Sequence, residues 1–233
     1  MDIAGIGMLR ALDLAGTCVF ALSGAALAVR ARMDLFGVLV LAIVTAVSGG
    51  IIRDLLVGVV PPTAISDWRP VALAVLSGAA CFLRPDALDR FRHPVQAFDA
   101  AGLGLFAATG AQAALEHGLN APMAAVLGMV SAIGGGIVRD VLMARVPVVL
   151  VSEIYAVAAL LGAAVVVASA GLGVPQPAGT AAGALLCFFL RVMAIYRGWR
   201  LPVATRLGPG VAEARGERPP GDPAGRSARR GEE

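Results

Sequence analysis

The sequence contains no lysine and few charged residues of any kind. All 19 basic residues are arginines, and only 15% of the 233 residues are charged, whereas 58% are hydrophobic. A soluble domain usually carries about 25% charged and roughly 45–50% apolar residues. The composition therefore excludes an ordinary cytosolic enzyme and a disordered protein. Without lysine, the chain also cannot form the Gly-Lys phosphate loop of nucleotide-binding proteins.

Cysteine and histidine are equally scarce. The three cysteines lie in apolar segments without a Cys-x-x-Cys pair, and the two histidines share no metal-ligand spacing. Such cysteines are typical of small core residues. We therefore expect no catalytic residues, no enzyme activity, no cofactor and no tightly bound metal ion. The arginines of the C-terminal region are not interleaved with aromatic residues, so we expect no nucleic-acid partner.

The sequence has a series of long apolar segments instead. A helix needs about 20 residues to cross the hydrocarbon core of a bilayer. Arginine, proline and glycine clusters separate seven segments of roughly this length, of which the third is short: 11–29, 35–59, 69–83, 97–115, 121–143, 151–170 and 178–196. The sequence therefore predicts an all-α membrane protein with seven transmembrane helices.

Arginines in the connections between these segments predict the orientation. Most lie after the first, third, fifth and seventh segments, at positions 30, 32, 84, 90, 92, 145, 197, 200 and 206. These connections share one side of the membrane, and short arginine-rich loops stay in the cytoplasm. We therefore expect the N-terminus outside and the C-terminus in the cytoplasm. The last region, 201–233, is rich in Pro, Gly, Arg and Glu, which predicts a disordered cytoplasmic tail.

The chain contains an internal duplication. Asp13 recurs as Asp99, and the segment 49–54 (GGIIRD) recurs as 135–140 (GGIVRD), each pair being 86 positions apart (99 − 13, 136 − 50, 139 − 53). Each copy holds three predicted helices, an odd number, so the second copy enters the membrane from the opposite face. Inverted repeats of this kind build many transport proteins, with the pathway between the halves. We expect a first repeat at 1–96, an inverted repeat at 97–175, a seventh helix at 176–200 and the tail at 201–233.

The duplicated motif ends in an Arg-Asp pair at membrane depth. Charges there are costly unless they are paired or face water, so they are candidates for function as well as for a structural role. Asp13 begins the first helix on the side of the membrane where Arg53 lies, and the duplication relates Asp99 to Arg139 in the same way. We predict the ion pairs Asp13–Arg53 and Asp99–Arg139. We expect the remaining carboxylates, Asp54 and Asp140, to interact with neighbouring residues or to face aqueous vestibules.

The glycines of the motif allow two interpretations. They permit close packing of helices, or they break the helix so that carbonyl groups face a cavity. Their repetition close to charged residues favours the break, and nearby hydroxyl groups either supply further oxygen ligands for a monovalent cation or bond back to a carbonyl. The predicted ion pathway, which Asp13 and Asp99 support, consists of Thr45, Ser48, Gly49, Gly50, Arg53, Asp54, Ser131, Gly134, Gly135, Gly136, Arg139 and Asp140.

Two three-helix repeats with this Gly-Gly-x-x-Arg-Asp motif, followed by a seventh helix, resemble the prokaryotic trimeric intracellular cation (TRIC) channels. The resemblance covers roughly residues 10 to 197. It implies a homotrimer in a bacterial-type inner (plasma) membrane, in contact with lipids. It also implies a K⁺-permeable pore in each protomer, lined by kinked second and fifth helices.

The same bacterial family includes proteins labelled glycine transporters, so a small amino-acid carrier is the alternative. A channel needs a continuous wet path, whereas a carrier needs a closed midplane site and alternating access. Arg53 and Arg139 would repel cations unless aspartates neutralise them, which counts against the channel. The carrier lacks acidic residues for a coupling ion beyond Asp54 and Asp140. We expect the channel.

Overall fold

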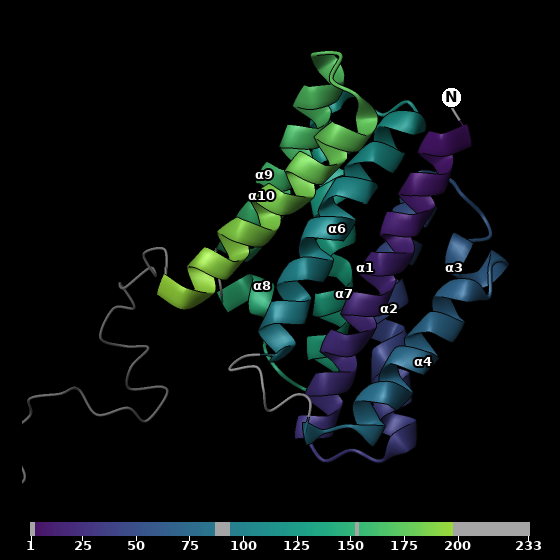
Figure 1. Cartoon of the computed structure of the whole chain (residues 1–233), viewed down its shortest axis with the longest axis vertical. Coiled ribbons are helices and arrows are strands. Elements are labelled where there is room, and N and C mark those ends of the chain that lie inside the picture. The colour runs from purple at the N-terminus through teal and green to yellow at the C-terminus, as the bar shows by residue number, and fades with distance from the viewer. Residues whose placement is uncertain (1–2, 87–93, 152–153, 198–233) are drawn as a thin grey trace, which may run out of the picture. The chain divides into compact units, whose positions relative to one another are not determined.

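The computed structural model describes residues 3–86, 94–151 and 154–197. All regular elements in these ranges are helices (Figure 1): α1 (Ile3–Arg30), α2 (Leu35–Leu56), α3 (Thr63–Ser66), α4 (Arg69–Leu83), α6 (Pro94–Glu116), α7 (Ala121–Leu142), α8 (Val148–Val151), α9 (Ile154–Gly171) and α10 (Gln176–Arg197). The predicted disordered tail, 201–233, lies outside the described residues.

Five of the described helices are long and apolar enough to cross a membrane, namely α1 from Gly7 onward, α2, α7, α9 and α10. The apolar helix α4 is shorter, with 15 residues. The remaining long helix, α6, contacts α1, α7, α9 and α10 and buries most of its residues. A helix surrounded by protein needs no lipid-facing leucine or isoleucine, which explains its composition of alanine, glycine and polar residues.

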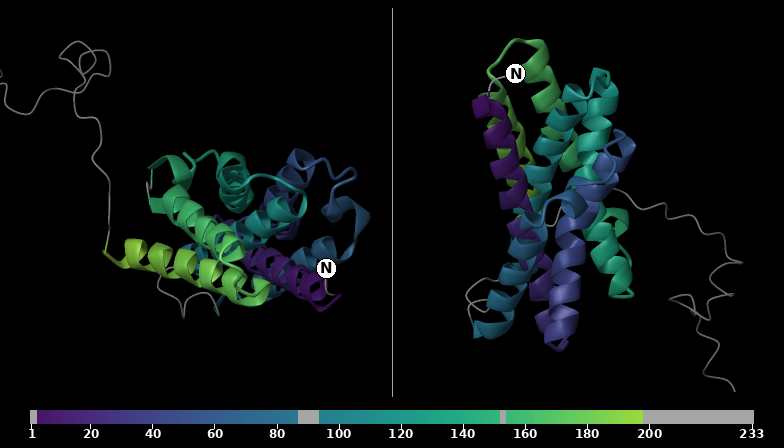
Figure 2. Two further views of the ribbon diagram at one scale, coloured as in Figure 1. Left: turned by 90° about the horizontal axis from the view of Figure 1, so that it is seen from above. Right: turned by 90° about the vertical axis from the view of Figure 1, so that its right-hand side faces the viewer.

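The core of the protein forms where the first half of the chain packs against the second. Helix α1 contacts α6, and α2 contacts α7. In Figure 1, α1 runs downward from the N-terminus and α6 runs upward. Short turns reverse the chain into α2 and into α7, so these two helices are also antiparallel, as Figure 2 shows from two further directions. The residues between the helices are mainly alanine, glycine and small polar residues.

Helices α2 and α7 end in the same backbone geometry. Their first and last residues differ by the same 86 positions (121 − 35, 142 − 56). After α2, Gly58 has φ +79° and the N–H of Val59 donates to the carbonyl of Asp54 at 2.8 Å. After α7, Ala144 has φ +52° and the N–H of Arg145 donates to the carbonyl of Asp140 at 2.9 Å. The second helix therefore places an alanine in the left-handed conformation that glycine adopts without strain.

Ala144→Gly is expected to stabilise the protein by about 1 kcal/mol, because a Cβ atom disfavours the left-handed conformation. The measurement is the free energy of unfolding of the purified protein in detergent. The reverse exchange at the matched position, Gly58→Ala, should lower it by a similar amount. A loss of stability in Ala144→Gly would show that the Ala144 methyl group makes contacts worth more than this strain.

Candidate functional site: two charged vestibules

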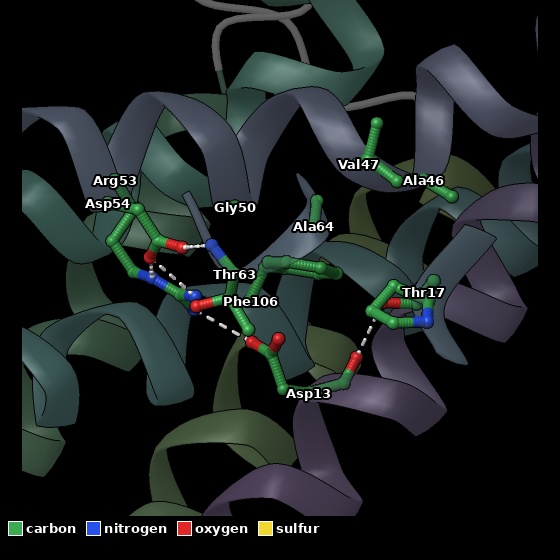
Figure 3. Close-up of a pocket in the computed structure, with 11 residues that line it drawn as sticks. Asp13, Thr17, Ala46, Val47, Gly50, Arg53, Asp54, Thr63, Ala64 and Phe106 are labelled. Carbon is green, nitrogen blue, oxygen red and sulfur yellow. Dashed lines mark hydrogen bonds and ion pairs between the residues drawn. The ribbon is translucent and has the colours of Figure 1, made fainter. Parts of the chain in front are cut away.

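Arg53, in the last turn of α2, lies between two aspartates (Figure 3). Its Nη1 donates to Asp13 Oδ1 on α1 at 2.7 Å, and its Nε donates to Asp54 Oδ1 at 2.9 Å. The other oxygen of Asp54 accepts from the backbone N–H of Thr63, the first residue of α3, at 2.8 Å. The structure thus contains the expected pair, and Asp54 both neutralises Arg53 and holds the start of α3.

Arg139, in the last turn of α7, is bound in the same way. Its Nη1 donates to Asp99 Oδ1 at 2.6 Å, and its Nε donates to Asp140 Oδ1 at 2.9 Å. Asp140 Oδ2 accepts from the N–H of Val148, the first residue of α8, at 2.9 Å. Nη1 of Arg139 also donates to Ser23 Oγ at 2.8 Å. This cluster is more buried, since 3% of the Arg139 side chain and 5% of the Asp99 side chain are exposed, against 9% of Arg53 and 23% of Asp13.

Each cluster lines a cavity. The cavity beside Arg53, here called the α2 vestibule, has a volume of about 20 Å³ and is lined in part by Asp13, Gly50, Arg53, Asp54, Thr63 and Phe106. The cavity beside Arg139, the α7 vestibule, has a volume of about 330 Å³ and is lined in part by Arg30, Asp99, Arg139, Asp140, Arg145 and Arg191. The smaller one has room for about one water molecule, whereas the larger one has the size of a small-molecule site.

A pair of aromatic rings lies between the two clusters. Phe20 and Phe106 stack with their centroids 5.2 Å apart, and each is 1% exposed. Along α1, Phe20 lies between Asp13, at the α2 vestibule, and Ser23, which bonds Arg139. Two glycines make room for the rings, since a Cβ at Gly102 would lie 2.5 Å from Phe20 and one at Gly16 would lie 2.9 Å from Phe106. The stacked pair thus occupies the middle of the protein.

The expected break in the second and fifth predicted helices is wrong. Helices α2 and α7 remain helical through their glycines. A Cβ at Gly49 would overlap the carbonyl oxygen of Ser131, and one at Gly135 would overlap the carbonyl oxygen of Thr45. These two glycines therefore let the α2 and α7 backbones touch, which is the packing role of small residues in membrane helices.

The other glycines of the motif have different surroundings. At Gly50, which lines the α2 vestibule, a Cβ would have its nearest neighbour, Phe106, at 3.8 Å. At Gly134, a Cβ would meet Ile52 at 3.0 Å, and at Gly136 it would meet the hydroxyl of Tyr155 at 2.7 Å. Among the motif glycines, Gly50 is thus the one at which an added side chain would extend into a vestibule.

The hydroxyl groups proposed as cation ligands are bonded to backbone carbonyls. Thr45 donates to Leu41 at 2.6 Å, Ser48 donates to Val44 at 2.6 Å, and Ser131 donates to Gly49 at 3.4 Å. The vestibule linings do not include these three residues. Their contacts fit the back-bonding alternative, and Ser131 in addition links α7 to α2.

Sequence reasoning missed Arg191. This arginine of α10 is 5% exposed, lines the α7 vestibule and lies with its guanidinium carbon 4.7 Å from the centre of the Tyr155 ring. Because α10 follows the second repeat, the duplication gave no signal for it. The rule that marks a charge inside an apolar segment applies to Arg191 as well and would have found it.

The sequence matches a family model described as "Glycine transporter" over residues 10–85 and 96–170. The chain is 45% identical to a UPF0126 membrane protein of Deinococcus radiodurans, over 82% of this chain and 90% of the relative. It is 36% identical to the inner membrane protein YadS of Escherichia coli, over 82% of this chain and 93% of the relative. The chain is thus a relative of bacterial membrane proteins.

Solved structures similar to this chain include TRIC channels. The TRIC orthologue from Rhodobacter sphaeroides has a TM-score of 0.79 at 36% identity, covering 82% of this chain and 99% of the orthologue. A prokaryotic TRIC channel crystallised in 0.5 M KCl has a TM-score of 0.78 at 31% identity, covering 84% of this chain and all of the other. These matches confirm the resemblance inferred from the motifs. By sequence and by structure, the chain belongs to the family of the TRIC channels.

Proposed function

We propose that the protein is a K⁺-permeable cation channel that works as a homotrimer, with a permeation pathway in each protomer. The pathway runs from the α2 vestibule to the α7 vestibule. The observation that carries this proposal is the pair of matching Asp-Arg-Asp clusters, because in each of them two carboxylates outweigh the arginine of the duplicated motif. The solved relatives are described as cation channels, and the Rhodobacter sphaeroides orthologue is described as trimeric.

The proposed membrane arrangement has seven spans, with α4 and α6 crossing in addition to the five apolar helices. The opposite directions of α1 and α6 support an inverted repeat (Figure 1). In this arrangement the α2 vestibule opens to the outside and the α7 vestibule to the cytoplasm of an inner membrane, the latter assignment resting on the arginine-rich connections. The relative YadS is described as an inner membrane protein.

The residues proposed to line the pathway are Asp13, Gly50, Arg53 and Asp54 on one side and Asp99, Arg139 and Asp140 on the other. Phe20 and Phe106 lie between the two groups as an apolar barrier that must move or become wetted for conduction. We propose that the remaining predicted pathway residues do not line the pathway and instead hold the helices that form it. Gly49, Gly134 and Gly135 set the distance between α2 and α7, and Gly136 lies against the hydroxyl of Tyr155. The hydroxyls of Thr45, Ser48 and Ser131 bond to carbonyls.

Gly50→Leu is expected to abolish K⁺ flux and to preserve the trimer. The new side chain enters the α2 vestibule, whose volume of about 20 Å³ is too small to hold it and a hydrated ion together. K⁺ release from liposomes is measured beside size-exclusion chromatography of each variant. Gly7→Leu is the matched control, because nothing lies within 4 Å of a Cβ at Gly7. Wild-type K⁺ flux in an assembled Gly50→Leu trimer would remove the α2 vestibule from the pathway.

A small amino-acid carrier is the second candidate. The observation that favours it is the buried Phe20–Phe106 pair between vestibules of about 20 and 330 Å³. A closed middle with one enlarged side is what alternating access requires. Uptake of labelled glycine into the same liposomes separates the candidates: saturable glycine uptake without K⁺ flux would replace the channel by the carrier.

A further inference from the structure

Two buried hydroxyl groups contact the ion pair of the opposite half of the chain. Ser23 on α1 is 0% exposed, and its Oγ accepts a hydrogen bond from Arg139 Nη1 at 2.8 Å. Thr109 on α6 is 1% exposed, and its Oγ1 donates to Asp13 Oδ1 at 3.4 Å. The first half thus bonds the charged cluster of the second half, and the second half bonds that of the first.

These two residues occupy equivalent positions of the duplication. They lie 86 positions apart (109 − 23), although neither belongs to the Gly-Gly-x-x-Arg-Asp motif. The vestibule linings do not include them. Each hydroxyl group can therefore affect a passing ion only through the charged side chain that it bonds.

The bonds of these hydroxyl groups differ from the usual bonds of serine and threonine in membrane helices. Such residues commonly donate to a carbonyl of their own helix, as Thr17, Thr45 and Ser48 do to the residue four positions earlier. Ser23 instead donates to the carbonyl of Val95, in the first turn of α6, at 3.2 Å. Its hydroxyl group therefore links α1 to both α6 and α7.

The two hydroxyl groups act on charges of opposite sign. The oxygen of Ser23 accepts from the Arg139 guanidinium and partly offsets its positive charge. The hydroxyl of Thr109 donates to the Asp13 oxygen that also accepts from Arg53 at 2.7 Å, and it partly offsets a negative charge. Removal of the first hydroxyl should make the α7 vestibule more positive, and removal of the second should make the α2 vestibule more negative.

We propose that Ser23 and Thr109 are positioning residues of the permeation pathway, each of which holds the charged cluster of the opposite half. This role rests on the proposed channel function. Charge at a constriction sets the electrostatic barrier to ions. Ser23 favours the passage of cations because it holds Arg139 away from the α7 vestibule, whereas Thr109 limits the attraction of cations to Asp13.

The test is single-channel recording of the purified protein in planar bilayers with KCl on both sides. Ser23→Ala should lower the K⁺ conductance by at most about tenfold, the factor that corresponds to one hydrogen bond to a charged group. Thr109→Val should raise it by less, because a bond of 3.4 Å is long. Thr109→Ser keeps the hydroxyl group and should conduct like the wild type.

Thr180→Val is the matched control. Thr180 on α10 is also 1% exposed, and its hydroxyl group has no hydrogen-bond partner among the residues that the structure describes. Its replacement should leave the single-channel conductance unchanged. A purely structural role of Ser23 and Thr109 would lower the number of channels and not the conductance of each, so unchanged conductance would overturn the proposal. Changes of the same sign in Ser23→Ala and Thr109→Val would overturn it as well.

Two further outcomes are decided by a second measurement. If Ser23→Ala does not fold, the rise expected of Thr109→Val and its absence in Thr109→Ser decide the proposal. If the wild type passes no K⁺ under any condition, the channel function fails, and the positioning bond is tested separately by the free energy of unfolding. The losses caused by Thr109→Val and Asp13→Asn should then be non-additive in the double variant, and additive losses would overturn the bond itself.

Discussion

Gly135→Leu is expected to prevent assembly of the folded protein before any effect on ion flux can be measured. At this residue, α7 touches α2 so closely that even a Cβ would overlap the carbonyl oxygen of Thr45. Gly49 has the same relation to the carbonyl oxygen of Ser131. Because backbone atoms cannot rotate away as a side chain can, a larger residue must separate the two helices. We expect a loss of more than about 3 kcal/mol, at the upper end of overpacking effects.

The measurement is the yield and the size-exclusion profile of Gly135→Leu, Gly135→Ala and Gly49→Leu. The alanine variant should already be impaired, since its single added carbon is the atom that overlaps. Gly7→Leu is again the control, because nothing lies within 4 Å of a Cβ at that position. A Gly135→Leu protein that elutes like the wild type would show that the two backbones can separate without loss of the fold.

Asp99→Asn is expected to destabilise the protein by about 3 kcal/mol, the lower end of the range for breaking a buried ion pair, because Arg139 loses one of its two carboxylates and keeps Asp140. The matched change Asp13→Asn should cost less. Its side chain is 23% exposed, against 5% for Asp99, so water can replace part of the lost interaction with Arg53. Unfolding of the two variants in the same detergent gives the comparison directly. Equal losses would mean that burial does not set the cost of breaking these pairs.

Exchanging the charges of Asp99 and Arg139 separates the free energy of their interaction from the free-energy cost of each single substitution. Asp99→Arg and Arg139→Asp should each be strongly destabilising, and the double variant should recover part of the stability. Recovery is expected to be incomplete, because Ser23 and Asp140 also bond Arg139 and are placed for a guanidinium at that position. Strictly additive losses would show that Asp99 and Arg139 are not coupled.

The charged clusters illustrate what can be predicted from the sequence. A buried charge needs a partner, and the duplication relates the pair in the first half to the pair in the second half. Asp13 and Asp99 could therefore be matched with their arginines from spacing and topology alone. Asp54 and Asp140 could not be placed fully, because their second bonds go to the first residues of α3 and α8. Those bonds depend on how the chain turns after each long helix.

The glycines illustrate the opposite case. Gly49 and Gly50 are adjacent and chemically identical, yet one lies against the Ser131 carbonyl and the other beside a vestibule. The break that the pattern favoured and the packing that the structure contains require the same residues in the same order. The choice depends on where α2 crosses α7, and no local property of either segment specifies that crossing.

The sequence by itself determined that the chain is a helical membrane protein, that it is duplicated, and that its motif arginines need carboxylate partners. These conclusions follow from composition, spacing and the cost of charge in a bilayer, which act on each segment separately. The tertiary structure decided which glycines touch a backbone, that Phe20 and Phe106 fill the middle, and that Arg191 joins Arg30 and Arg145 in one cavity. These features arise where helices distant in the sequence meet, because packing depends on the shapes of both partners at once.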